Sequence, residues 1–310
     1  MPLGFGLASS HAPSMFAQVQ DWPKLQEVLT RGLPQPPALR EETRDVLEGY
    51  VDRIQRNFAT LRAQLEEYEP DAVIIVGDDQ GEVFSKAFVP AFAMFLGEEA
   101  SGTLNLGLLG QPHDQNHITV KGQPALARFL LEGLLSRGFD FAYIEELQPL
   151  GRPAAGLGHA FTRLSNVLGL VERHIPTVIT FVNAYHPPLP SAKRCLDLGA
   201  AMAGVLASWP ERIAIIGSGG LSHDPMGPRA GWIDEPLDRW FLDRIGAANL
   251  EPLEHLFGFD SATLRGGTGE IRSWLVTAGA FPSTKATVVD YIPAHHAVTG
   301  LGFAYWTPCS

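Results

Sequence analysis

The sequence predicts an α/β fold of three layers, in which a central, mostly parallel or mixed sheet lies between two layers of helices. Short apolar runs alternate along the chain with longer segments of helical periodicity, which is the pattern of such folds. The runs at 72–76 and 213–216 are apolar throughout, as is typical of strands buried on both faces. We therefore expect helices to cover both faces of the sheet.

The elements follow one another without an internal repeat or a low-complexity segment. A first strand is predicted at 3–8, and a long helix at 41–67, where apolar residues recur near the helical period. Further strands are predicted at 72–76, 141–144, 177–182, 213–216, 286–291 and 302–306, and further helices at 124–137, 191–208, 236–247, 251–257 and 269–280. We expect residues 1–310 to form a single catalytic domain.

The composition is that of an ordinary enzyme with a sizeable core. Hydrophobic residues make up 45% of the chain, and the formal net charge is -11. An acidic chain is a poor partner for nucleic acid or an anionic membrane, because phosphate-binding surfaces carry excess positive charge. Two cysteines, Cys195 and Cys309, fit a reducing compartment, and no secretory signal or membrane-spanning run is present. These features predict a cytoplasmic protein.

Three histidines lie in turns rich in small residues. His11 follows the first predicted strand, His223 follows the strand at 213–216 in the sequence Gly-Gly-Leu-Ser-His, and His159 stands in Leu-Gly-His. A single histidine of this kind is usually a buried structural residue that bonds to a backbone carbonyl. Because ligand sites gather at strand ends in α/β sheets, the three together indicate an active site.

Glu270 is the natural carboxylate partner of these histidines. It stands in a Gly-rich entry to a helix, with Thr268 as a plausible N-cap, so it also fits an acid that interacts with the helix dipole. Two histidines and one carboxylate with open positions form the arrangement that binds non-haem Fe(II).

Other polar residues leave two interpretations open. Asp78 and Asp79 follow a strand and either ligate a metal or cap the next turn. His113 and His117 are four residues apart, but Pro112 and the polar neighbours favour a loop over a zinc-binding helix.

Seven segments in the chain resemble those of the class III extradiol ring-cleavage dioxygenases, which include the catalytic β subunit of protocatechuate 4,5-dioxygenase and the gallate and methylgallate dioxygenases. They are Ser-Ser-His-Ala-Pro at 9–13, Gly-Leu-Gly-His-Ala-Phe at 156–161, Gly-Ser-Gly-Gly-Leu-Ser-His at 217–223, Gly-Glu-Ile-Arg-Ser-Trp at 269–274, and shorter matches at 190–195, 227–231 and 299–302. They occur in the family's order, so the resemblance covers nearly the whole chain.

The resemblance implies an Fe(II) enzyme that opens catecholic rings beside the two hydroxyl groups with O2. By motif, His11 and Glu270 are the iron ligands, His223 is the acid/base histidine, and His159 is a second histidine in the pocket. It also implies a substrate carboxylate, whose candidate partners are Arg229, His295 and His296. Arg229 has an alternative role as a structural ion-pair partner, and the two adjacent histidines have one as surface residues.

The resemblance has further implications for assembly. A homodimer is expected. Some members of the family use a small separate subunit that covers the active-site mouth, so this chain either needs such a subunit or closes its own site with the segments at 32–38 and 97–122.

One position departs from the family. Its other metal histidine follows the second strand in an Asp-His context, and here that place is taken by Gln80. Either Gln80 binds iron through its amide oxygen, or Asp79, His113 or His117 supplies the ligand, or the site has lost iron, in that order of preference. The last reading supports an alternative function, in which the chain is a non-catalytic metal- or partner-binding relative that keeps the fold.

Overall fold

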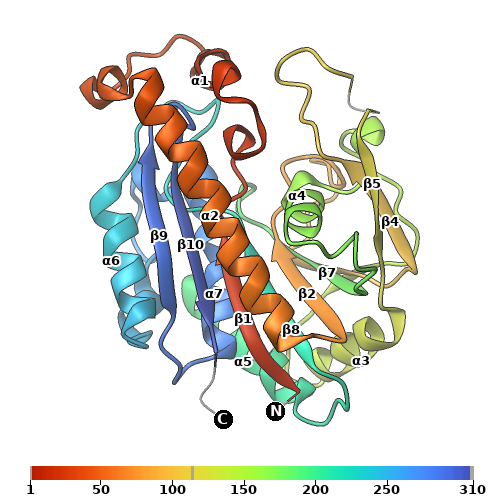
Figure 1. The fold of residues 1–310 in the computed structure, drawn as a ribbon. Coiled ribbons are helices and arrows are strands. Elements are labelled where there is room, and N and C mark those ends of the chain that lie inside the picture. Colours follow the sequence, from red (N-terminus) through yellow and green to blue (C-terminus); the bar gives the residue numbers. More distant parts are fainter. Residues whose placement is uncertain (1, 113–114, 308–310) are drawn as a thin grey trace.

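The structure is a computed structural model that describes residues 2–112 and 115–307. His113 and Cys309 lie outside the described residues. Eight strands form one sheet in the order β6-β3-β7-β2-β8-β1-β10-β9, and two strands form a separate hairpin (Figure 1).

The sheet is mixed, with a parallel centre. The strands are β1 (Leu3–Ser9), β2 (Ala72–Gly77), β3 (Phe92–Phe95), β6 (Ala142–Ile144), β7 (Thr177–Val182), β8 (Ile213–Ser218), β9 (Thr287–Ala294) and β10 (Thr299–Trp306). Strands β7, β2, β8 and β1 run parallel to one another, whereas β10 pairs antiparallel with β1 and with β9. The hairpin consists of β4 (Glu99–Thr103) and β5 (His117–Lys121).

Helices cover both faces of the sheet. They are α1 (Trp22–Thr30), α2 (Arg44–Tyr68), α3 (Pro124–Leu135), α4 (His159–Val167), α5 (Ala192–Leu206), α6 (Glu235–Gly246) and α7 (Ile271–Ala280). Short 3-10 segments lie at Pro13–Phe16, Val19–Asp21, Pro37–Glu41, Pro153–Ala155, Glu251–His255, Ala262–Leu264 and Gly266–Glu270. Figure 1 shows α2 crossing one face of the sheet, with α5 and α7 behind it. The predicted three-layer α/β fold is confirmed.

Each face of the sheet has its own hydrophobic core, because successive side chains of a strand point to opposite faces. In β2, Val73 and Ile75 pack with α2 and α4, while Ile74 and Val76 pack with α3, α5 and α7. All four side chains are fully buried. This explains why the central strands are apolar at every position.

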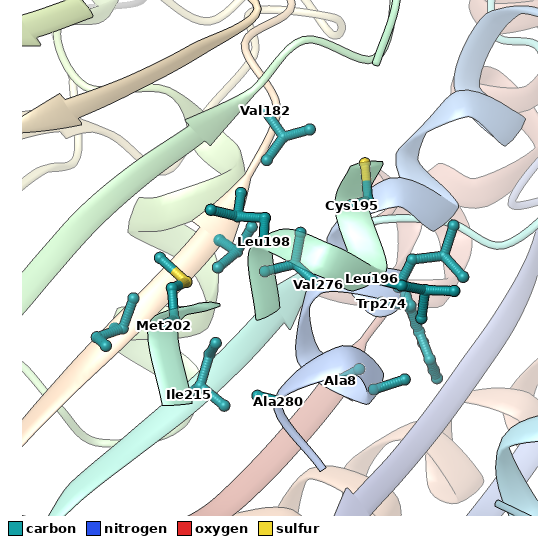
Figure 2. Packing of buried hydrophobic residues seen from close by; sticks show 14 of the residues in the cluster. Ala8, Val182, Cys195, Leu196, Leu198, Met202, Ile215, Trp274, Val276 and Ala280 are labelled. Carbon is teal, nitrogen blue, oxygen red and sulfur yellow. The ribbon is translucent and has the colours of Figure 1, made fainter. Parts of the chain in front are cut away.

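Helices α5 and α7 approach each other unusually closely. The backbone of Gly199 in α5 lies against Val276 of α7, and Gly279 of α7 lies against Leu196. Figure 2 shows this packing, with labelled side chains from both helices and from the sheet: Ala8, Val182, Cys195, Leu196, Leu198, Met202, Ile215, Trp274, Val276 and Ala280. The contact fixes α7, which follows directly after Glu270.

Several elements were not predicted. Strand β3 has only four residues, and β4 (Glu-Ala-Ser-Gly-Thr) contains no large apolar side chain. Helices α1 and α4 have nine residues each, which leaves little room for a periodic pattern. The segment at 251–257 was predicted as a helix, and a short 3-10 turn occupies Glu251–His255. None of the helices in the described ranges combines the length and apolar character needed to cross a membrane.

Candidate active site

The site forms where the parallel strands end. Strand β1 leads to His11 and β2 leads to Asp78, while β8 leads to the turn that carries His223. Because these strands are parallel neighbours, their carboxyl ends meet at one edge of the sheet. Glu270 joins them from the 3-10 turn Gly266–Glu270, immediately before α7.

A cavity of about 170 Å³ opens at this edge. Its lining contains five residues that the sequence singles out: His11, Gln80, His159, His223 and Glu270. The remaining lining residues are Ala12, Pro13, Leu29, Leu106, Leu108, Arg152, Gly220, Pro225, Met226, Ala297 and Thr299. An apolar cavity of about 150 Å³ accommodates benzene, so this volume suits one aromatic ring.

Three donors besides His223 hold Glu270. Its Oε2 accepts the backbone N–H of Gly220 at 2.7 Å, and its Oε1 accepts the Tyr185 hydroxyl at 2.5 Å and the amide Nε2 of Gln80 at 2.9 Å. Burial raises its pKa, but His223 and the other groups around it more than offset this effect, so the net shift is downward. Glu270 is therefore an ionised carboxylate in a buried place.

The hydrogen bonds of His11 determine which of its nitrogens carries the proton. Ser218 Oγ donates to the carbonyl oxygen of Ala160, so it accepts from His11 Nδ1, which lies 2.9 Å away. Nε2 of His11 then carries a lone pair, has no hydrogen-bond partner among the described residues, and lies 3.7 Å from Glu270 Oε2. Burial lowers the pKa of His11 to about 3, which keeps the ring neutral. A lone pair and a carboxylate that face each other favour a cation between them.

Asp78 adds an unpaired carboxylate to this pair. It is buried, and neither of its oxygens has a hydrogen-bond partner in the described structure. Burial, together with the charge of Glu270, raises its pKa well above the usual value. Donor atoms of His11, Asp78 and Glu270 lie within 4.8 Å of one another, so the three residues can hold a metal ion. An unpaired buried charge is costly, and a bound cation removes the cost.

The other candidates for the third ligand occupy different positions. Gln80 lines the cavity and points its amide nitrogen at Glu270. The carboxylate of Asp79 accepts backbone N–H groups of the turn that follows it, up to Phe84. His117 begins β5, is exposed, and has its Nε2 3.0 Å from the carbonyl oxygen of Ala154. Each assignment as a metal ligand stays a prediction.

His223 lies beside the carboxylate of Glu270. Its Nδ1 donates to the carbonyl oxygen of Leu221 at 2.9 Å, and its Nε2 lies 3.3 Å from Glu270 Oε1. Burial alone would lower the pKa of His223, but the charge of Glu270 and the hydrogen bond to it raise it overall. The turn that carries His223 is held by two residues. Thr268 Oγ1 accepts the backbone N–H of His223, and the buried Asp238 accepts the backbone N–H and the hydroxyl of Ser222.

His159 is the first residue of α4 and pairs with a residue that the sequence reasoning missed. Its Nδ1 lies 2.6 Å from Oε1 of Glu82, which is 1% exposed. The charge of His159 and its hydrogen bond outweigh the effect of burial and lower the pKa of Glu82 to about 2. The ring of His159 meets that of His11 edge to face, with centroids 4.8 Å apart. Glu82 lies two positions after Gln80 in the sequence. This proximity to a candidate ligand was the one feature of the sequence that could have indicated a role for Glu82 in the site.

Arg152 and Tyr185 were also missed. Arg152 lines the cavity and lies 3.4 Å from Glu82, and its Nε and Nη2 donate to the backbone carbonyls of Gly81 and Gln80. Its Nη1 makes no hydrogen bond to any described residue. Neither residue belongs to a recognisable motif, and only the folded structure shows that both lie near the site.

The three residues predicted to meet a substrate carboxylate do not line the cavity. Arg229 lines a small neighbouring pocket on the far side of His223. His295 and His296 both donate their backbone N–H groups to Glu42, and the His296 ring also bonds to it. Their role in substrate binding stays a prediction.

Of the two segments expected to close the site, the longer one contributes to the cavity. Leu106 and Leu108, in the loop between β4 and β5, belong to the lining, whereas no residue of 32–38 does. The hairpin loop therefore forms part of the cavity wall.

A comparison with protein families finds one match that spans almost the entire chain. Residues 6–304 match the model of the catalytic LigB subunit of aromatic ring-opening dioxygenase.

Individual relatives are more distant. The 2,3-dihydroxyphenylpropionate/2,3-dihydroxicinnamic acid 1,2-dioxygenase of Photorhabdus laumondii is 28% identical over 197 residues, which are 63% of this chain and 56% of the relative. The gallate dioxygenase of Pseudomonas putida is 30% identical over 175 residues, 55% of this chain and 48% of the relative. The chain thus spans about half the length of these curated relatives.

Among solved structures, an uncharacterized protein from Escherichia coli K12 has the same fold. The TM-score is 0.51 at 15% sequence identity, and the alignment covers 97% of this chain and 99% of the other.

Proposed function

Because the chain belongs to the family of catalytic LigB subunits of aromatic ring-opening dioxygenases, we propose that it opens the ring of a catecholic aromatic with O2, next to the two hydroxyl groups, with Fe(II) as cofactor. The main support is the pair formed by the lone pair of His11 Nε2 and the carboxylate of Glu270, 3.7 Å apart. Two donors at about 2.1 Å from one ion are at most about 4.2 Å apart, so this separation is compatible with a shared ion.

His11 and Glu270 would hold the iron, with a third donor from the turn at 78–80. A bound ferrous ion would supply the activation of O2 beside the deprotonated catechol oxygens. The volume of about 170 Å³ leaves room for one ring. The apolar side chains of Leu106, Leu108 and Met226 exclude water from around that ring.

His223 is the proposed acid/base residue. Its Nδ1–H is held by the carbonyl oxygen of Leu221, so proton exchange takes place at Nε2, on the side of Glu270. The neutral ring accepts the proton of the second substrate hydroxyl at Nε2 and returns it later, as imidazole does near neutral pH. His159, oriented by Glu82, forms a hydrogen bond with a substrate hydroxyl group in the same cavity.

We propose Arg152 as the partner of a substrate carboxylate. Two of its donors are held by backbone carbonyls, so the guanidinium is kept in place, and Nη1 remains available. A guanidinium group fixed in this way can offer Nη1 to a carboxylate oxygen in a charge-assisted hydrogen bond. Arg229, His295 and His296 are further predicted partners, though they do not line the cavity.

Three properties of the whole protein rest on the family resemblance and the composition. We propose a homodimer, a small partner subunit as a possible cover of the active-site mouth, and a cytoplasmic location that fits the presence of only two cysteines.

The function is tested by anaerobic reconstitution of the purified chain with Fe(II). We expect one iron per chain and, with O2, the yellow absorbance of ring-opened product from protocatechuate, gallate or a substituted catechol. Iron incorporation without product from any of these compounds contradicts the proposal. A chain that takes up no iron supports the alternative function, a non-catalytic relative whose metal set is altered at Gln80.

A further inference from the structure

We infer that Asp78 supplies the third protein donor of the metal centre, and that Gln80 is a positioning residue that orients Glu270 towards the ion. The centre would then consist of one imidazole and two carboxylates. The inference rests on the proposed function in taking a divalent cation as the occupant.

The first argument concerns hydrogen bonding. Asp78 is 3% exposed, and both of its oxygens are buried without a hydrogen-bond partner in the described residues. A protonated carboxyl group would need an acceptor for its O–H, and an ionised one would need donors or a positive charge. The part of the chain that the structure describes meets neither need. A cation shared with His11 Nε2 and Glu270 satisfies the ionised form.

The second argument concerns Gln80. Its Nε2 donates to Oε1 of Glu270, and the hydroxyl of Tyr185 donates to the same oxygen. These two bonds occupy Oε1 and leave Oε2 as the oxygen nearest His11. An amide that donates to a metal-binding carboxylate orients the ligand without binding the metal itself. An amide oxygen is in any case a weaker donor than the carboxylate of Asp78.

The third argument concerns the neighbouring carboxylate. Both oxygens of Asp79 accept backbone N–H groups, from Gly81 and Phe84 to Oδ2 and from Val83 to Oδ1. These bonds shape the turn that carries Gln80 and Glu82. Asp79 therefore has a structural role, while the adjacent Asp78 has none that the described contacts explain.

The charge of the centre follows from this donor set. Two carboxylates balance the charge of a divalent ion, whereas a set of two histidines and one carboxylate leaves one positive charge. Oxygen-rich sets suit Mn(II), while imidazole-rich sets suit Fe, Ni, Cu and Zn. We therefore expect the site to bind Mn(II) readily, which makes Mn(II) a suitable probe.

The test is Mn(II) binding to the full-length chain after removal of metal by a chelator, with free Mn(II) measured by EPR. The wild-type chain should bind one ion. Asp78→Asn should weaken binding by about 100-fold or more, and Gln80→Ala by about 10-fold, as expected for the loss of a ligand and of a residue that orients one. Asp79→Asn is the matched control and should weaken binding less than Asp78→Asn does.

The inference fails if Asp78→Asn binds Mn(II) as the wild-type chain does, if Gln80→Ala loses binding to the same extent as Asp78→Asn, or if the wild-type chain binds no Mn(II). Thermal unfolding of the metal-free chains is the control that shows whether each variant is folded. Because an amide of nearly the same shape replaces the unpaired carboxyl group, the metal-free variant should melt close to the metal-free wild type. Should it fail to fold, anomalous scattering from Mn(II) in crystals of the wild type decides, by showing whether an Asp78 oxygen bonds to the ion.

These measurements do not depend on turnover. A chain that binds Mn(II) through Asp78 but opens no catechol ring supports the inference and contradicts the proposed function. If the wild-type chain opens the ring and the Asp78→Asn variant keeps full metal affinity, the proposed function is supported and the inference is contradicted.

Discussion

The protonation of His11 shows how one hydroxyl group prepares a site. Ser218, the last residue of β8, donates to Ala160 and can only accept from His11. The lone pair of the imidazole is thereby directed at Glu270 before any ion arrives. Such fixed tautomers are common among metal-binding histidines, whose second nitrogen is held by a neighbouring group.

His223 offers the most direct test of proton transfer. His223→Gln should lower kcat by about 100-fold, because an amide can form hydrogen bonds but cannot exchange a proton near neutral pH. Iron content, measured on the same preparation, should stay at the wild-type level. Unchanged turnover would remove His223 from the mechanism.

Arg152 is expected to determine the preference for carboxylated substrates. Arg152→Gln should raise KM for protocatechuate by about 10-fold or more, because a charge-assisted hydrogen bond is lost. With an uncharged catechol as the matched substrate, KM should change little. Equal effects on both substrates would show that Arg152 acts only through its pairing with Glu82.

Only some residues of the site could be predicted from the sequence. His11, His159, His223 and Glu270 stand in motifs, and all four line the same cavity. Arg152 lies in no motif, because its position depends on two backbone carbonyls in a turn far away in the sequence. The sequence could not show that the Asp78 carboxyl group lacks hydrogen-bond partners, because this depends on which residues surround it in the fold.

At the scale of elements, the packing of α5 on α7 determines how firmly Glu270 is held. A Cβ atom on Gly199 would collide with the carbonyl oxygen of Val276. Gly199→Ala should therefore lower the free energy of unfolding by about 1–3 kcal/mol, as expected for overpacking. Denaturant unfolding monitored by circular dichroism measures this change.

Gly204 lies on the same helix and provides the control. A Cβ there would have its nearest neighbour at 3.6 Å, in the side chain of Arg137. Gly204→Ala should stabilise the protein by up to about 1 kcal/mol, because alanine favours the helical conformation. If both substitutions had the same effect, the close contact between the helices would not be the cause.

The elements that sequence reasoning found are those with long or fully apolar patterns. Strand β7 has the predicted bounds, 177–182, because every residue of it is buried. The hairpin of β4 and β5 was missed, since its strands have only five residues each and pair with each other outside the main sheet. Its importance for the cavity lies in the connecting loop, whose leucines no periodicity identifies.

At the scale of the whole molecule, metal binding should couple to stability. Ligand that binds only the folded state at about 100 times its Kd adds about 2.7 kcal/mol to the free energy of unfolding. We therefore expect removal of the metal by a chelator to lower Tm by about 5 °C, and Fe(II) or Mn(II) to restore it. Calorimetry on one preparation gives both values, and an unchanged Tm would show that the buried donors hold no ion.

The strand order has a consequence for how the enzyme is made. The proposed donors lie far apart in the sequence, at His11, Asp78 and Glu270, and β10, which pairs with β1, follows the last of them. A growing chain therefore exposes an incomplete set of ligands until Glu270 and β10 have been synthesised. Capture of the ion by all three proposed donors therefore has to follow the synthesis of Glu270.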